Sequence, residues 1–412
     1  MRAAALTAAL GALAPAGAAH AATGPGALIL GGGAIADTNA AVYGTFVARS
    51  GGPAARIGVI TAASVVPADD PNANDPATCS NSVCNGAYYT GLLKNTYGAA
   101  DAQWIPIDLD HVGNNSSQAV LDQLNSMTGF FFGGGDQSRL VATLLKSDNS
   151  DSPALAVIRA RFAAGAAIMG TSAGTTITNG RDMVTGGESW DALRYGPYTS
   201  ISSSYPDDLS YRPEGGFHLF TSGLIDTHFA ARGREGRLVR LAAATGHARA
   251  FGIDEDTALV VTNPGTADET DSVVGTNGVS VLDLRGDTVG TRSGYWSVDG
   301  VKWSHLTSGD TYRPATWTAT SAKPAYAPAT GTVGSRWSDV FSSPNSPTAH
   351  PYQLVKMAGE LVAAGRSTTQ YGISQESGPT FEADLTKAPS YRAWKSGSAV
   401  SFADLTLHLY VY

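Results

Sequence analysis

Charge and cysteine are both scarce in this chain of 412 residues. Charged residues make up 15% of the sequence and hydrophobic residues 43%, a balance typical of proteins with a buried core and not of disordered chains. Basic residues are not in excess, because the formal net charge is −8, which argues against a protein that binds nucleic acid or an anionic membrane surface. The composition indicates an acidic globular protein of one large domain or two ordinary ones.

The only two cysteines, Cys79 and Cys84, lie close together in a polar segment rich in Asn and Pro. Two cysteines lack the further ligands that a structural zinc site needs, so we expect no metal there. Neither stands at a turn from a strand to a helix, which disfavours a cysteine nucleophile. In an exported protein we expect the pair to form a disulfide that closes a short loop.

Long apolar runs are also missing, since no segment after the N-terminus approaches the roughly 18 apolar residues that suggest a membrane span. The N-terminus itself combines Arg2, an Ala- and Leu-rich stretch, and the small residues of Ala19-His20-Ala21. This pattern predicts a signal peptide over residues 1–21, cleaved near Ala21/Ala22, and a protein secreted to an extracellular or periplasmic space. The alternative is an Ala-rich start without a targeting role.

Short apolar runs alternate with helix-like stretches from residue 27 to about residue 260. The apolar runs are 27–30, 57–60, 104–107, 129–132 and 166–169, and the helix-like stretches are 40–49, 87–96, 118–124, 139–146 and 154–164. This alternation predicts an α/β fold with a mostly parallel sheet flanked by helices. In such sheets the active site forms at the carboxyl ends of the strands, where glycines follow residues 30, 132 and 169.

The pattern of apolar and polar residues changes beyond residue 262. Alternating apolar and polar residues over 273–284 and 294–306 predict β-hairpins, and residues 320–348 are rich in Ser, Thr, Pro and Gly. A helix-like segment at 352–364 and a strand-like run at 405–412 follow. We therefore predict an α/β domain over 22–313 and a linker with a C-terminal extension of unknown role over 314–412, the C-terminal part being rich in β-structure.

The sequence Gly170-Thr171-Ser172-Ala173-Gly174 lies between the apolar run 166–169 and a helix-compatible stretch. It predicts a nucleophile elbow, in which small residues on both sides of a serine let the chain turn sharply and expose Oγ. A serine hydroxyl attacks only when a base and an oxyanion site are placed around it.

The oxyanion site is predicted from the glycines at 133–135, which precede Asp136 and Gln137. The backbone amides of Gly135 and Ala173 are the expected donors. A phosphate-binding loop is disfavoured, because neither 31–33 nor 133–135 continues into a dinucleotide or P-loop motif. A plain tight turn remains the alternative.

The expected base is His228, which ends the apolar run 223–227. Four arginines follow it, namely Arg232, Arg234, Arg237 and Arg240. Guanidinium groups match carboxylates, so this cluster indicates a carboxylate-binding site, although a solvated basic face would have the same composition. Asp254, Glu255 and Asp256 could supply an acid that orients the histidine, or could serve a turn.

In this order these motifs resemble the cyanophycinase branch of the peptidase E-like serine peptidases, family S51. The resemblance is carried by glycines leading to Asp-Gln, by G-T-S-A-G, by D-x-H-F-x-x-R-x-R-x-x-R-L and by G-I-D-E-D-T-A-L, over about residues 27–313. It implies a flavodoxin-like fold, similar to class I glutamine amidotransferases. It also implies a triad of Ser172 as nucleophile, His228 as base and Glu255 as the orienting acid, without metal or cofactor.

The resemblance further implies hydrolysis of cyanophycin, a poly-aspartate backbone with arginyl branches, to β-Asp-Arg dipeptides, commonly by a homodimer. The residues implied to line the substrate pocket are Gln137, Asp226, Arg232, Arg234 and Arg237. Asp136, Glu188 and Asp226 are candidates to receive the guanidinium of a branch. The chain has Thr227 where relatives often have glutamine, which puts one substrate hydrogen bond in doubt.

Three other functions remain open. A dipeptidase of the same family would cut aspartyl or isoaspartyl dipeptides. An α/β-hydrolase esterase could use Asp207 or Asp208 as its acid, but the chain has no His-Gly-Gly-Gly segment and is long after His228. A catalytically inactive, secreted binding protein would share the fold alone.

Overall fold

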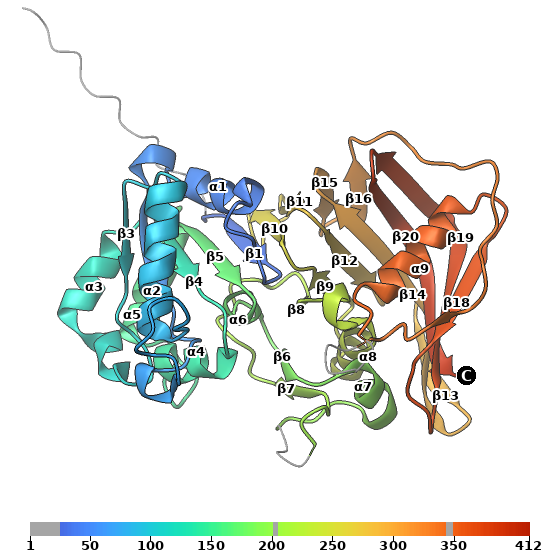
Figure 1. Cartoon of the computed structure of the whole chain (residues 1–412), viewed down its shortest axis with the longest axis horizontal. Helices are drawn as coiled ribbons and strands as arrows, with labels where there is room; N and C mark the ends of the chain where they lie inside the picture. The colour runs from blue at the N-terminus through green and yellow to red at the C-terminus, as the bar shows by residue number, and fades with distance from the viewer. Residues whose placement is uncertain (1–24, 201–204, 343–348) are drawn as a thin grey trace, which may run out of the picture.

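The computed structural model describes residues 25–200, 205–342 and 349–412 (Figure 1). The predicted signal peptide and its cleavage site lie outside the described residues. Within the described ranges, no helix is long and apolar enough to cross a membrane. The strands form two nine-stranded sheets and one two-stranded sheet.

The first sheet has the predicted parallel core. Its strand order is β16-β15-β11-β10-β1-β5-β4-β2-β3, and neighbouring strands from β1 to β3 run parallel. The parallel strands are β1 (Leu28–Gly31), β5 (Ala167–Thr171), β4 (Gly129–Phe132), β2 (Arg56–Ile60) and β3 (Asp101–Trp104). The antiparallel side consists of β10 (Thr257–Thr262), β11 (Thr270–Gly275), β15 (Asp310–Arg313) and β16 (Thr318–Ser321).

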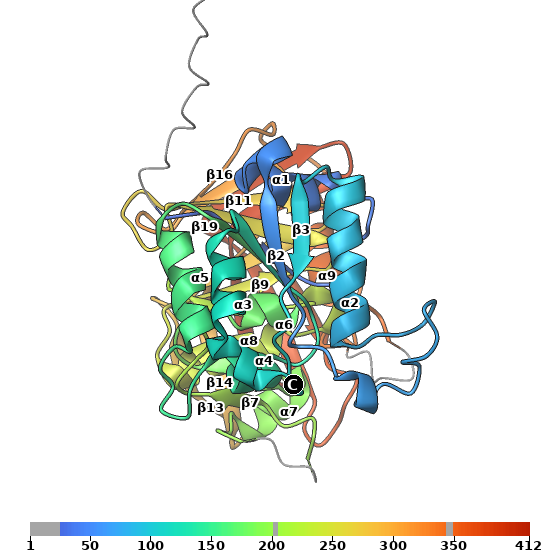
Figure 2. The same ribbon diagram turned by 90° about the vertical axis from the view of Figure 1, so that its left-hand side faces the viewer.

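Helices cover both faces of this sheet (Figure 2). One face packs against α3 (Gln118–Asn125), α4 (Gln137–Leu144) and α5 (Pro153–Ala163), and the other against α1 (Ala40–Arg49) and α2 (Ser82–Gly91). Successive strand residues point to opposite faces, so Phe130 and Phe132 enter the first core while Phe131 enters the second. The α/β prediction, with helices on both faces, is confirmed.

Several elements differ from the prediction. Residues 273–284 and 294–306 do not each form a hairpin, since Thr270–Gly275 and Gly278–Asp283 belong to different sheets and Tyr295–Thr307 is a single strand. Two boundaries also differ. The third strand is Asp101–Trp104 and not 104–107, because Pro106 has no amide hydrogen to donate, although the Ile105 amide still bonds to the Val59 carbonyl at 2.9 Å. The helix expected at 87–96 begins at Ser82, since the Asn81 side chain accepts hydrogen bonds from the first-turn amides. Cys84 lies in that turn and forms the predicted disulfide with Cys79.

The second sheet is built from the second half of the chain (Figure 1). Its order is β17-β18-β19-β20-β14-β12-β9-β8, with β13 paired to β14. The strands are β8 (Leu224–Thr227), β9 (Arg249–Ile253), β12 (Gly278–Asp283), β13 (Thr288–Arg292), β14 (Tyr295–Thr307), β17 (Trp337–Ser338), β18 (Thr369–Ile373), β19 (Phe381–Ser396) and β20 (Ala399–Val411). Residues 314–412 therefore add β16 to the first sheet and β17–β20 to the second, with α9 (Gln353–Ala363) packed on the latter.

The region between the sheets holds the candidate site. Ser172 follows β5 of the first sheet and starts α6 (Ala173–Thr176), whereas His228 follows β8 of the second. Glu255 lies on the link from β9 in the second sheet to β10 in the first. The two-stranded sheet of β6 (Met183–Gly186) and β7 (Ser210–Arg212), with α7 (Ser189–Tyr195) and α8 (Glu235–Thr245), lies next to this region.

Candidate active site

The chain turns sharply at Ser172, whose φ is +53° and ψ is −118°. Few non-glycine residues adopt a positive φ, and such strain is concentrated at functional sites. The flanking glycines are sterically required. A Cβ on Gly170 would lie 2.2 Å from the Gly174 carbonyl oxygen, and a Cβ on Gly174 would lie 2.1 Å from that of Phe132. The structure thus has the geometry of an elbow at the predicted serine.

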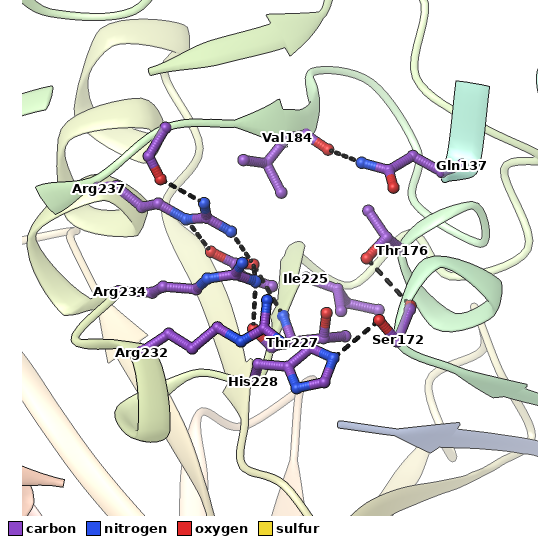
Figure 3. Close-up of polar contacts among 12 residues, drawn as sticks. Gln137, Ser172, Thr176, Val184, Ile225, Thr227, His228, Arg232, Arg234 and Arg237 are labelled. Carbon is purple, nitrogen blue, oxygen red and sulfur yellow. Dashed lines mark hydrogen bonds and ion pairs between the residues drawn. The ribbon is translucent and has the colours of Figure 1, made fainter. Parts of the chain in front are cut away.

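Ser172, His228 and Glu255 form a continuous hydrogen-bonded chain. His228 Nδ1 lies 2.7 Å from Glu255 Oε1, and Nε2 lies 2.9 Å from Ser172 Oγ (Figure 3 shows the latter contact). Because a carboxylate only accepts hydrogen bonds, Nδ1 is the donor and Nε2 is left to accept from the serine hydroxyl. The structure therefore joins three residues that are far apart in the sequence.

The loop 31–33 holds the imidazole of His228 in place. The His228 amide donates to the Gly32 carbonyl at 2.7 Å, and His228 has a φ of +50°. Gly33, at φ +98°, faces the ring so closely that a Cβ there would lie 2.3 Å from Nε2. Gly33, which sequence analysis did not relate to the base, thus makes room for the ring.

Burial lowers the pKa of His228 to about 4, and the nearby Arg232 and Arg234 lower it as well, against the opposing effect of Glu255. An imidazole that is neutral at neutral pH can accept a proton, as a general base must.

We expect kcat/KM to be constant from pH 8 to about pH 5 and to fall below that, because protonated His228 cannot accept the serine proton. The measurement is a pH–rate profile on a soluble peptide substrate. Arg232→Gln removes one positive charge near the ring, so the acidic midpoint is expected to move to higher pH, separately from any change in KM. A midpoint near 6.5 in the wild type, the ordinary value for histidine, would contradict this assignment.

The predicted oxyanion donors lie beside the serine. Gly135 has a φ of +136°, and a Cβ there would lie 2.2 Å from the Ala63 carbonyl oxygen. A Cβ on Gly134 would lie 3.4 Å from Ser172 Cβ, so this glycine loop passes directly over the serine. Ala173 is the first residue of α6, where amides have no acceptor within the helix. Gly135 and Ala173 both line the adjacent pocket.

The pocket has a volume of about 180 Å³. It contains most of the predicted site residues together with four that sequence analysis missed. The missed residues are Thr176, Val184, Thr185 and Gly186. Thr176 stands four residues after Ser172, and this helical spacing was a usable signal. The other three belong to β6, and no pattern in the sequence points to them.

Two of the arginines predicted to bind carboxylates form hydrogen bonds to other residues of the protein. Arg237 makes two 2.7 Å hydrogen bonds to the buried Asp226 carboxylate and a 2.6 Å bond to the Gly187 carbonyl. Arg234 donates to the Thr227 carbonyl at 2.7 Å and lies 3.3 Å from Asp226 (Figure 3). Burial alone would raise the pKa of Asp226, but these two guanidinium groups hold it below its ordinary value.

Arg232 differs from the other two. Its side chain is 40% exposed, lines the pocket and lies 4.0 Å from Glu255. Arg240, the fourth arginine of the predicted cluster, stacks on Trp296 with its guanidinium carbon 4.6 Å from the ring centre. All three arginines line the pocket as predicted, but Arg234 and Arg237 are bound to Asp226, whereas Arg232 is not.

The remaining predicted residues take separate positions. Gln137 lines the pocket and donates through Nε2 to the Val184 carbonyl at 3.0 Å. Asp136 accepts from the Ser138 amide at 2.8 Å and caps α4. Thr227 lines the pocket beside the base. Among the described residues, no group of three His, Cys, Asp or Glu side chains is placed to hold a metal ion.

Comparison with known proteins points to one group of peptidases. Residues 82–267 match the model of Peptidase family S51. The cyanophycinase of Trichormus variabilis is 29% identical over 263 residues, 64% of this chain and 74% of the relative. The cyanophycinase of Synechococcus elongatus is 31% identical over 58% of this chain and 62% of its own length. These similarities to family S51 support a serine peptidase.

Similarity to solved structures is more distant. A crystal structure of a peptidase from an acI-B1 actinobacterium is 17% identical, with a TM-score of 0.46, and the match covers 70% of this chain and 97% of the other.

Residues after 313 support both loops that carry this site. The Tyr352 amide donates to the Ala230 carbonyl at 2.8 Å, close behind His228. Asn277 Nδ2 lies 2.8 Å from the Glu255 carbonyl and 3.3 Å from the Tyr352 hydroxyl. The segment at Phe341 packs tightly on Gly233. A Cβ on Gly233 would lie 2.5 Å from the Phe341 carbonyl carbon.

We expect Tyr352→Phe to lower kcat about 3- to 10-fold with KM unchanged, because it removes a hydrogen bond worth about 1 kcal/mol that steadies the Glu255 loop. Steady-state kinetics on a soluble substrate measures this. Tyr371→Phe, at a 40% exposed residue of β18, is the matched control and should leave kcat unchanged. A change in KM alone would contradict a positioning role for Tyr352.

Proposed function

We propose that this protein is a secreted cyanophycinase that cleaves the poly-aspartate backbone of cyanophycin to β-Asp-Arg dipeptides. The observation that carries the proposal is the hydrogen-bonded chain from Ser172 through His228 to Glu255 beside a pocket that Arg232 enters. The matches to cyanophycinases support the choice of substrate.

In this mechanism Ser172 Oγ attacks a backbone amide carbonyl while His228 Nε2 takes the hydroxyl proton. Glu255 holds the imidazole in the required tautomer and stabilises its protonated form. The amides of Gly135 and Ala173 stabilise the oxyanion, and loss of one such donor costs roughly 10²–10³ in rate. His228 then protonates the leaving amine, and water, deprotonated by the same nitrogen, hydrolyses the acyl-enzyme.

Both charges of the substrate have partners near the pocket. The main-chain carboxylate of an arginyl branch suits Arg232, since Arg234 and Arg237 are bound to Asp226. Of the acids considered for the branch guanidinium, Asp226 is enclosed by arginines and Asp136 caps α4. Glu188 precedes α7, next to the pocket wall at Gly186, and is close enough to Arg234 to interact electrostatically.

The test is incubation of the mature protein, starting at Ala22, and its Ser172→Ala variant with insoluble cyanophycin, with the soluble products identified by mass. Release of β-Asp-Arg by the wild type alone supports substrate, bond and nucleophile together. Absence of release, with cleavage of aspartyl or isoaspartyl dipeptides, would replace the proposal by the dipeptidase. Absence of both activities and of covalent labelling by a serine-reactive probe would favour an inactive binding protein.

Secretion is part of the same proposal and rests on the N-terminal sequence. Expression of the full chain with N-terminal sequencing of the exported protein tests it. A mature N-terminus at Ala22 supports the proposal, and full-length protein retained in the cell would contradict it.

A further inference from the structure

A second hollow adjoins the active pocket at the predicted oxyanion loop. It has a volume of about 360 Å³ and is called the Arg139 hollow below. Its lining includes Ser64, Ser80, Asn85, Gly134, Gly135 and Arg139. Gly135 lines the active pocket as well, and a Cβ on Gly134 would lie 3.4 Å from Ser172 Cβ. The Arg139 hollow therefore begins beside the nucleophile.

The Arg139 hollow lies at the carboxyl edge of the parallel sheet. β5, β4 and β2 are neighbours in that sheet, and Ser172 directly follows β5. The glycines at 133–135 directly follow β4, and Ser64 lies shortly after β2. In parallel α/β sheets, ligands bind along this edge. A polymer that extends beyond the active pocket can thus reach the hollow across Gly135.

Arg139 gives the hollow a positive charge. Among the described residues that line it, Arg139 alone is charged. Its Nη1 donates to the Ala63 carbonyl at 2.9 Å, which holds the guanidinium in place. Over the ranges that the structure describes, no carboxylate forms an ion pair with Arg139. Because a guanidinium has five N–H donors, Arg139 can still bind a carboxylate.

The loop of residues 79–84, closed by the disulfide, forms one wall of the hollow. The amide of Ser80, in this loop, donates to the Asp70 carboxylate at 2.9 Å. Asn85 Nδ2 donates to Ser64 Oγ at 2.9 Å, which ties the start of α2 to the segment after β2. The hydroxyl groups of Ser64 and Ser80 add hydrogen-bonding capacity beside Arg139. The wall is therefore held in place and polar, as a site for a carboxylate requires.

We propose that the Arg139 hollow is a second substrate subsite, in which Arg139 binds the main-chain carboxylate of the arginyl branch next to the one in the active pocket. This inference rests on the proposed function for the identity of the polymer. It makes Arg139 a specificity-determining residue and gives it no part in the chemical step.

The test uses three soluble tetrapeptides, each of two β-Asp-Arg units. One is unmodified, and in each of the other two a different arginyl carboxylate is replaced by a carboxamide. Arg139→Gln should raise KM on the unmodified tetrapeptide about 10-fold, because a charge-assisted hydrogen bond is lost. On one of the two amidated tetrapeptides the wild type should show the same increase, and Arg139→Gln should add nothing further.

Arg161→Gln is the matched control. Arg161 also donates to a backbone carbonyl, that of Met127, but Met127 precedes β4 and so lies at the opposite edge of the sheet. This variant should leave the kinetics on all three tetrapeptides unchanged, and melting temperatures report folding. An equal loss for Arg139→Gln on all three tetrapeptides, or a fall in kcat alone, would mean that Arg139 merely supports the glycine loop. Either result would overturn the subsite and leave the cyanophycinase proposal intact.

A binding measurement separates the subsite from the proposed function. Calorimetry compares the Ser172→Ala protein with Ser172→Ala/Arg139→Gln on the same tetrapeptides. A Kd about 10-fold higher in the double variant, with the difference lost on one amidated tetrapeptide, supports the subsite even if the wild type cleaves nothing and the proposed function fails. Equal Kd values in the two proteins, or no binding by either, would overturn it.

Discussion

Ser172→Ala is expected to abolish hydrolysis, with a loss of about 10⁴–10⁶-fold in kcat, while the protein keeps its fold. The loss follows because no other group occupies the position 2.9 Å from His228 Nε2 from which Oγ would attack. Folding should persist because alanine preserves the small side chain of the elbow. Hydrolysis rates and labelling by a serine-reactive probe measure the effect.

Two further substitutions serve as comparisons for this experiment. Ser138→Ala, at an exposed serine of α4, should leave both activity and labelling unchanged. Ser172→Gly should be as inactive as the alanine variant but at least as stable, because glycine adopts a φ of +53° without strain. Labelling that survives in Ser172→Ala would place the nucleophile elsewhere.

Gly33→Ala is expected to lower kcat/KM about 10²-fold or more, although Gly33 itself performs no chemistry. A methyl group at this position would lie 2.3 Å from the imidazole, so the ring must move away from Ser172. Displacement of a reacting group by about 1 Å costs on the order of 10²-fold in rate. The measurements are kcat, KM and the rate of covalent labelling of Ser172.

Controls separate the steric effect from backbone strain. Gly98 also has a positive φ, of +72°, but nothing lies within 4 Å of the position that a Cβ would take there, so Gly98→Ala tests strain alone. Gly44, within α1 and equally open, tests the substitution in a helix. If Gly33→Ala kept activity within twofold of the Gly98→Ala variant, the close contact between Gly33 and His228 would be refuted.

Local sequence was sufficient for much of the parallel sheet. Short apolar runs predicted β1, β2, β4 and β5 to within a residue or two, because a strand buried on both faces needs a run of apolar side chains. The third strand was misplaced because the prediction used hydrophobicity alone, which does not take into account that Pro106 lacks an amide hydrogen. The start of α2 was misplaced because the cap at Asn81 precedes the apolar part of the helix.

For the candidate site too, some features could be predicted from the sequence and others could not. Ser172 was predictable because the elbow requires glycine on both sides within a few residues, and this constraint is local. The partners of the arginines were not predictable, since the Arg237–Asp226 pair depends on how α8 packs against β8. The same holds for the wall at Val184–Gly186, which lies near Ser172 only through the folding of β6.

The amino-acid sequence by itself determined the alternation of strands and helices, the elbow and the set of polar residues available for catalysis, because these depend on neighbours in the chain. Only the tertiary structure decided which of these residues meet. Ser172 comes from the first sheet and His228 from the second, and the link between the sheets carries Glu255. Their contacts depend on the packing of the two sheets, in which residues beyond 313 take part through Tyr352.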